Sequence, residues 1–232
     1  GQQASFEESV MGHAFPIQPV RPGTVLAGQL EGSLEELSKT FNTEKRSAIS
    51  PFQKSGVMVN RVYWTTDVIP EWDGDFATLG DVLQPNKEVD ASFKIDKESL
   101  ERWKYLKGAK REPRTNKALG YTYMFSEGAL AFPDPIDRPS RTIITGEGGA
   151  SPSRTKHAVK QGRTLRRLTP IELERLNMFP DDHTRLEGVS DGRRAFFMGN
   201  ALVVGIIERV GTALLTSIKA NVACQEIERP TV

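Results

Sequence analysis

The last third of the chain predicts two helices in series. Thr169-Pro170-Ile171-Glu172 matches a capping box, since Thr169 can accept from a free amide while Glu172 reaches back, and proline suits the first helical position. Met178-Phe179-Pro180-Asp181-Asp182 ends this helix, because the residue before a proline is disfavoured in a helix and paired aspartates favour a turn. Asn200 then precedes a second helix, where it can serve as N-cap. Apolar residues at steps of three and four predict that this helix buries a broad face: Leu202, Val203, Ile206, Ile207, Val210, Leu214 and Leu215.

Composition limits the setting in which these helices fold. With 232 residues and 38% hydrophobic content, the chain can bury a core in one large or two small domains. A single cysteine excludes an internal disulfide and favours a reducing compartment. The longest nearly apolar run, Ala195–Ile207, is too short to span a bilayer, and the amino end lacks the features of a signal peptide, so we expect no membrane partner.

The charge is unevenly distributed along the chain, although the net charge is only +1. Residues 102–167 carry 15 Lys and Arg against 5 Asp and Glu, whereas residues 1–101 carry 9 against 16 and residues 168–232 carry 7 against 9. A concentrated cationic segment is typical of proteins that bind a phosphate backbone, because each neutralised phosphate releases counterions. A solvated basic face that binds nothing is the alternative.

The amino-terminal half predicts short helices around one β-hairpin. Residues 1–50 are interpreted as a connecting segment with a helix at Ser33-Leu34-Glu35-Glu36. Residues 52–69 predict two strands with a tight turn at Asn60-Arg61. Thr78-Leu79-Gly80-Asp81-Val82-Leu83 opens another short helix, and Lys97–Lys107 forms a longer one that ends at Gly108 as a left-handed cap.

The basic segment predicts two strands and a loop. Lys110–Lys117 is interpreted as a basic loop, and Tyr121–Phe125 and Arg141–Thr145 as strands on either side of a proline-rich stretch. Gly146-Glu147-Gly148-Gly149 forms either a flexible turn or a turn whose amides approach a phosphate.

Several motifs resemble those of DNA cytosine-5 methyltransferases. Arg167–Pro180 followed by Phe197–Val204 is similar to the closing motif of that family, and Asp137–His157 is similar to its penultimate motif. Ser55–Met58 and Thr78–Leu83 resemble the lead-in that follows the basic motif of the catalytic half. The matches lie in family order over most of residues 52–215.

The same family requires elements that are missing here. Its catalytic thiolate, which attacks C6 of a flipped cytosine, follows a proline, whereas the single cysteine, Cys224, follows Ala223 and is interpreted as a structural or surface thiol. The Glu-Asn-Val and Phe-x-Gly-x-Gly motifs have no match, and Gln161–Arg166 departs from Gln-x-Arg-x-Arg in spacing and position. The chain therefore resembles only the carboxyl-terminal half, and we expect it not to methylate DNA alone.

The resemblance implies an α+β fold in which a small, mostly β target-recognition domain precedes helices that complete a Rossmann-like, S-adenosylmethionine-dependent methyltransferase domain. The expected boundaries are 1–50 for the connection, 51–163 for target recognition and 164–232 for the closing helices. Asn200 and Ala201 would line a shared S-adenosylmethionine site. No catalytic or metal-binding residue is expected, since the histidines are isolated. The expected DNA contacts are Arg111, Arg114, Asn116, Lys117, Arg138, Arg141, Thr142, Arg154 and Lys156.

The expected partners are double-stranded DNA and a catalytic half supplied by the same parent chain or by a separate subunit. The expected location is the bacterial cytoplasm, in association with the nucleoid, within a restriction-modification system. Two alternatives belong to other classes: a non-catalytic, sequence-specific DNA-binding module that acts with another protein, and a nuclease-like partner, for which no Pro-Asp with a following Glu-x-Lys is found.

Overall fold

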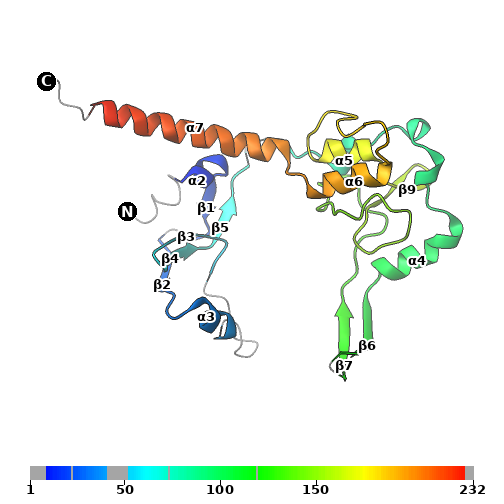
Figure 1. The fold of residues 1–232 in the computed structure, drawn as a ribbon, viewed down its shortest axis with the longest axis horizontal. Coiled ribbons are helices and arrows are strands. Elements are labelled where there is room, and N and C mark those ends of the chain that lie inside the picture. Colours follow the sequence, from blue (N-terminus) through cyan, green and yellow to red (C-terminus); the bar gives the residue numbers. More distant parts are fainter. Residues whose placement is uncertain (1–8, 22, 41–51, 73, 119, 228–232) are drawn as a thin grey trace. The chain divides into compact units, whose positions relative to one another are not determined.

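The computed structural model describes residues 9–21, 23–40, 52–72, 74–118 and 120–227, and the side chains of residues 38–40 and 221–227 lie outside this description. The chain divides into two compact units (Figure 1). Unit 1 contains Gly1–Gly74 and Ile207–Val232, and unit 2 contains Asp75–Ile206. Both units mix helices with short antiparallel strands, which agrees with the predicted α+β class.

Unit 1 contains two small antiparallel sheets. In the first, β1 (Ile17–Pro19) pairs with β5 (Val68–Pro70), and in the second the order is β2 (Leu26–Gln29), β4 (Val62–Thr66) and β3 (Ser55–Val59). The predicted hairpin is confirmed: Asn60 and Arg61 both have positive φ angles, 50° and 66°, as the tightest hairpin turn requires. Residues before position 50 do more than connect, because they supply β1 and β2 to these sheets.

Among the described residues, the helices of unit 1 are α2 (Val10–Ala14), α3 (Leu34–Thr40) and most of α7 (Val204–Ile227). The predicted start of α3 is confirmed, since the Ser33 amide donates to Glu36 and the Glu36 amide donates to the Ser33 hydroxyl. Arg209 of α7 donates from Nε to the Ala14 carbonyl at 2.6 Å. This bond joins α7 to α2 within the unit.

Helix α7 exists as predicted, but the prediction that it buries a broad apolar face is wrong. Most of its apolar side chains and the adjoining Leu202 are 38–68% exposed, whereas Val210 is half-buried and Ala213 is buried. The exposed set is Leu202, Val204, Ile206, Ile207, Leu214, Leu215 and Ile218. By length and composition alone, the helical stretch Asp191–Ala220 contains a segment apolar enough to cross a membrane, with a mean hydropathy of 1.7 in that segment. Within the described part of the chain, these seven side chains remain exposed.

Unit 2 contains three short 3-10 helices and three α-helices. The 3-10 helices are η1 (Leu79–Val82), η2 (Asn86–Glu88) and η3 (Ala91–Phe93), and the α-helices are α4 (Lys97–Lys107), α5 (Pro170–Leu176) and α6 (Asp191–Asn200). The predicted capping boxes are confirmed at Thr78 with Asp81 and at Thr169 with Glu172. The end of α4 is also confirmed, but Gly108 has φ −69°, so its predicted left-handed cap is wrong. The chain leaves α4 directly into extended backbone.

The strands of unit 2 form two antiparallel hairpins. β6 (Lys110–Asn116) pairs with β7 (Tyr121–Glu127), and β8 (Ala158–Gln161) pairs with β9 (Thr164–Arg167). The predicted basic loop is therefore a strand, because its backbone pairs over seven positions with the predicted strand beside it. The prediction of a strand at Arg141–Thr145 is wrong. Gly199 of α6 lies directly against the backbone at Thr145, so this segment packs against a helix and not against a partner strand.

The core of unit 2 forms where α5, α6, η1 and the second hairpin meet. Six buried apolar side chains make up this core: Leu79, Val159, Leu168, Leu173, Ala195 and Met198. Each buried leucine contributes about 1.5–3 kcal/mol of favourable transfer free energy. Ala195 and Met198 anchor α6 in this core.

The position of Asn200 differs from the prediction. Ser190 caps α6 through the Arg193 amide, and the helix then continues through Asn200, which is its last residue. Ala201 is the C-cap, and α7 begins at Val204. Asn200 therefore closes one helix instead of capping the next.

Candidate functional site

The β6–β7 hairpin projects from the rest of unit 2 (Figure 1). Both of its carboxylates are paired with cations. Arg114 donates from Nε and Nη2 to Glu112 Oε1 at 3.0 and 2.8 Å, and this hydrogen bonding lowers the pKa of Glu112. Glu127 accepts from Lys110 at 3.0 Å and lies 3.3 Å from Arg154. The acidic charge of the hairpin is therefore neutralised internally.

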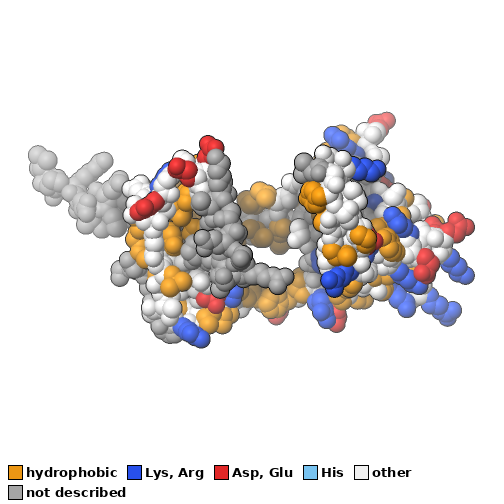
Figure 2. All heavy atoms as spheres, turned by 90° about the horizontal axis from the view of Figure 1, so that it is seen from below, with side chains coloured by type: hydrophobic (Ala, Val, Ile, Leu, Met, Phe, Trp, Pro, Cys, Tyr) orange, Lys and Arg blue, Asp and Glu red, His pale blue; other side chains and the backbone are white. Residues whose placement is uncertain are grey.

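Two other hairpin cations remain unpaired. Arg111 and Lys117 are exposed, and neither makes an ion pair with any residue that the structure describes. Asn116 lies between them at the end of β6, and its side-chain oxygen accepts from the Ala118 amide at 3.0 Å. Figure 2 views unit 2 from the side toward which the hairpin points, and Lys and Arg side chains are exposed there beside hydrophobic ones. The four predicted DNA contacts of this segment thus lie on one projecting element.

The remaining predicted DNA contacts lie elsewhere in unit 2. Arg138 is exposed beside Asp137, and Thr142 is exposed at the edge of a cavity. Arg141 donates to Asp134 at 2.7 Å, and Arg154 donates to the Gly128 carbonyl at 2.6 Å. Lys156 is only 7% exposed, and its ammonium donates to two backbone carbonyls at 2.8 Å. Arg141, Arg154 and Lys156 therefore hold loops of unit 2 together.

Several ionic groups of unit 2 are buried. Lys107 and Asp134 are 1% and 3% exposed and lie 3.1 Å apart, with Arg141 on the other carboxylate oxygen. Burial lowers the pKa of Lys107. Burial opposes ionisation of Asp134, but bonds from Arg141, the Ala158 amide and Lys107 outweigh it and lower the pKa of Asp134. A second buried pair joins His157 to Glu147 at 2.9 Å.

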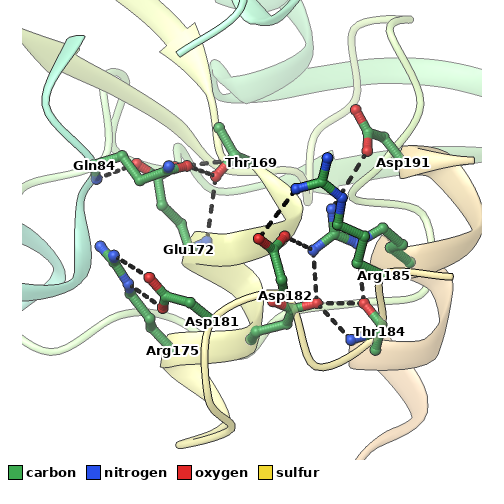
Figure 3. A network of polar contacts seen from close by, with 11 residues as sticks. Gln84, Thr169, Glu172, Arg175, Asp181, Asp182, Thr184, Arg185 and Asp191 are labelled. Carbon is green, nitrogen blue, oxygen red and sulfur yellow. Dashed lines mark hydrogen bonds and ion pairs between the residues drawn. The ribbon is translucent and has the colours of Figure 1, made fainter. Parts of the chain in front are cut away.

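A polar network holds α5 to its neighbours (Figure 3). Arg166 and Glu172 are both fully buried and lie 2.6 Å apart, and Gln84 accepts a bond from Thr169 beside them. On the other side of α5, Glu174 pairs with Arg194 at 2.9 Å. The sequence does not predict these pairs, because a count of charges along the chain cannot match a cation to an acid from another segment.

The glycine-rich turn at 146–149 is a packing element. A Cβ added to Gly148 would lie 2.7 Å from the Gly192 Cα of α6, and Glu147 is buried against His157. Gly199 approaches the backbone at Thr145 even more closely. Glycine at positions 148 and 199 therefore allows α6 to lie close to the irregular backbone of residues 144–149.

One of the two predicted cofactor residues lines a cavity of about 460 Å³ in unit 2. Ala201 lines it together with Thr78, Met198 and Gly199, whereas Asn200 is exposed and donates from Nδ2 to the Phe196 carbonyl at 2.9 Å. Cys224 lies in α7 beyond the side chains that the structure describes. Among the described residues, no three His, Cys, Asp or Glu side chains could hold a metal ion together.

Residues 36–216 match the family described as C-5 cytosine-specific DNA methylase. The chain belongs to this C-5 cytosine-specific DNA methylase family. The match covers the hairpin, the buried ion pairs and the cavity, so each of these features lies within the part of the chain that the family shares.

Individual proteins are also similar to this chain. The chain is 35% identical over 210 residues to the type II methyltransferase M.Sau3AI of Staphylococcus aureus, a match that covers 90% of this chain and 47% of that protein. It thus spans about half the length of this relative. Two solved structures also resemble it: Entamoeba histolytica EhMeth, with 12% identity, a TM-score of 0.41 and coverage of 84% and 54%, and S. pombe Dnmt2, with 15%, 0.42 and coverage of 92% and 65%.

Proposed function

We propose that this chain is the carboxyl-terminal part or subunit of a DNA cytosine-5 methyltransferase. The family match over residues 36–216, with coverage of only 47% of M.Sau3AI, carries the proposal. In it, residues 51–163 recognise DNA, residues 164–232 complete the catalytic domain, and the catalytic cysteine lies outside this chain. The protein would act in the bacterial cytoplasm, on the nucleoid, as the modification enzyme of a restriction-modification system.

The projecting hairpin supports a role in DNA binding. Arg111 and Lys117 are exposed without ion pairs among the described residues, and the acids beside them are already neutralised. Cations of this kind are available to phosphates at no cost of breaking an internal ion pair. Arg138 and Thr142 add exposed polar groups on the same unit, whereas Arg141, Arg154 and Lys156 act as scaffold in this proposal.

Asn200 and Ala201 would form one wall of a shared S-adenosylmethionine site. The residues fit such a wall, because the Asn200 amide is exposed and Ala201 lines a cavity whose 460 Å³ falls in the range of small-molecule sites. S-adenosylmethionine supplies the methyl group when bound. The residues of this chain orient it, while the opposite wall belongs to the missing half.

The exposed apolar face of α7 supports an interface with that half. Apolar patches larger than a few hundred Å² are rare on free monomers and mark interaction sites. The face follows directly after Ala201, so a catalytic half that covered it would also reach the proposed cofactor wall. Insertion of α7 into lipid vesicles, in place of binding to the catalytic half, would contradict this part of the proposal.

A second candidate is a non-catalytic, sequence-specific DNA-binding module that acts with another protein. It is favoured by the absence of a Pro-Cys and a Glu-Asn-Val motif from the sequence. One observation, methyl transfer to DNA, distinguishes the two candidates. Methyl transfer to DNA after addition of a polypeptide with both motifs supports the methyltransferase, and binding without transfer supports the module.

The test combines the full chain, a separately expressed polypeptide with those motifs, duplex DNA and labelled S-adenosylmethionine. We expect transfer only with both polypeptides, and transfer by this chain alone would contradict the proposal. Asn200→Ala should weaken cofactor binding by the assembled protein about three- to tenfold, the effect of one lost hydrogen bond. Thr216→Ala is the matched control, because Thr216 also donates to the carbonyl four residues earlier on an exposed helical turn.

A further inference from the structure

The two faces of the β6–β7 hairpin carry different chemistry. Residues directly opposite each other in an antiparallel pair point to the same face, and neighbours along a strand alternate. The register Arg114↔Tyr123 and Asn116↔Tyr121 therefore places these residues on one face, here called the reading face. The register places the following residues on the opposite face, here called the back face: Arg111, Pro113, Thr115, Thr122, Met124 and Ser126.

The reading face exposes two aromatic rings next to each other. Tyr121 and Tyr123 are 50% and 43% exposed, and their ring centroids lie 5.9 Å apart. Neither hydroxyl has a hydrogen-bond partner in the described part of the chain. Arg114 lies on the same face, with its guanidinium carbon 3.4 Å from the centroid of the Phe125 ring. The face thus offers free hydroxyls, aromatic surface and a guanidinium held in place by stacking.

The back face has neither an aromatic ring nor an amide side chain. The hydroxyls of Thr115 and Thr122 lie 3.1 Å apart and bond to each other, and Pro113 and Met124 are apolar. Arginine and asparagine are the side chains that bind guanine and adenine edges with two hydrogen bonds. The reading face carries both, in Arg114 and Asn116, together with the two exposed rings, whereas the back face carries Arg111 alone.

We propose that the reading face enters the major groove of duplex DNA and that Tyr121 and Tyr123 determine which sequence the protein recognises. This inference rests on the proposed DNA-binding function. A major groove about 12 Å wide admits a two-stranded β-ribbon, and this hairpin projects as such a ribbon (Figure 1). Arg111 on the back face and Lys117 in the turn are exposed cations that remain available to phosphates. The net positive charge of the hairpin favours DNA over a protein partner.

The experiment selects bound duplexes from a pool with a randomised segment, using the full chain and its variants Tyr121→Ala and Tyr123→Ala. Met124→Ala is the matched control, since Met124 is 57% exposed on the neighbouring position of β7 but points to the back face. We expect each tyrosine variant to lose about tenfold or more in the ratio of selected-sequence to non-specific affinity. Non-specific affinity and its salt dependence should change less than about threefold.

Phenylalanine variants then separate the ring from the hydroxyl. Loss of sequence discrimination in Tyr121→Phe or Tyr123→Phe assigns the effect to hydrogen bonding by the hydroxyl, and retention assigns it to the ring. Both outcomes support the inference if the alanine variants lose sequence discrimination. Unchanged selection by the alanine variants, equal loss in Met124→Ala, or binding without sequence preference by the parent chain overturns the inference but leaves DNA binding intact. Failure of the parent chain to bind any duplex overturns the proposed function and, with it, this inference.

Discussion

Arg166 and Glu172 form an ion pair in which neither side chain is exposed to solvent. Glu172 also occupies the third helical position in the capping box of α5. Its carboxylate therefore accepts from the backbone amides of Thr169 and Gln84 and from the Arg166 guanidinium. Burying a charge is costly unless it is paired and hydrogen-bonded. The pair therefore ties the start of α5 to β9 and to the segment after η1.

Removal of the Glu172 charge should destabilise unit 2 strongly. Glu172→Gln leaves the Arg166 guanidinium buried without a counter-ion, and we expect a loss of about 3–5 kcal/mol in the free energy of unfolding, measured by urea denaturation. Glu101→Gln is the control, because its pair with Lys104 is exposed and should contribute about 1 kcal/mol or less. Equal losses in the two variants would contradict the structural role of the buried pair.

Acid should weaken unit 2 through Asp134. Its pKa is lower in the folded chain than the usual value of about 3.9 for an unfolded chain. Its contribution to stability is therefore fully present above that usual value and is lost as the pH falls through the folded pKa. Urea denaturation from neutral pH into this acid range should show a decline that Asp134→Asn reduces. An unchanged acid decline in Asp134→Asn would show that other carboxyls cause it.

Gly199 should be required for packing as well as for any role in the closing motif. A Cβ at this position would overlap the backbone of Ile144 and Thr145, so Gly199→Ala should cost about 1–3 kcal/mol of unfolding free energy. Gly128→Ala is the control, because nothing lies within 4 Å of the added Cβ and φ is not positive. A thermal denaturation midpoint for Gly199→Ala equal to that of Gly128→Ala would contradict the close approach.

The sequence predicted local structure well where the signal itself is local. The capping boxes at Thr78 and Thr169 and the turn at Asn60 each depend on residues within four positions, and each is confirmed. The strand predicted at Arg141–Thr145 is absent, because the backbone of this segment packs against Gly199 of α6, more than fifty positions away. The exposed face of α7 was also predicted wrongly, since periodicity identifies an apolar face but not the chain that covers it.

The candidate site shows the same limit. A count of charges identified residues 102–167 as basic, but it could not separate the internally bonded Lys156 from the unpaired Arg111, since that depends on acids and carbonyls distant in sequence. The strand at Lys110–Asn116 was missed because Pro113 and five charged residues nearby lower its β propensity. Pairing with β7 decides the conformation in this case.

The hairpin cations should set part of the salt dependence of DNA binding. For a protein that contacts phosphates, the logarithm of the binding constant falls with the logarithm of salt by about 0.9 per contact. Arg111→Ala and Lys117→Ala should each reduce this slope by about that amount in mobility-shift titrations, because neither cation is paired among the described residues. Lys104→Ala, which removes a cation already paired with Glu101, should leave the slope unchanged. Equal slopes in all three variants would place the phosphate contacts outside the hairpin, and binding that salt does not weaken would contradict phosphate contacts altogether.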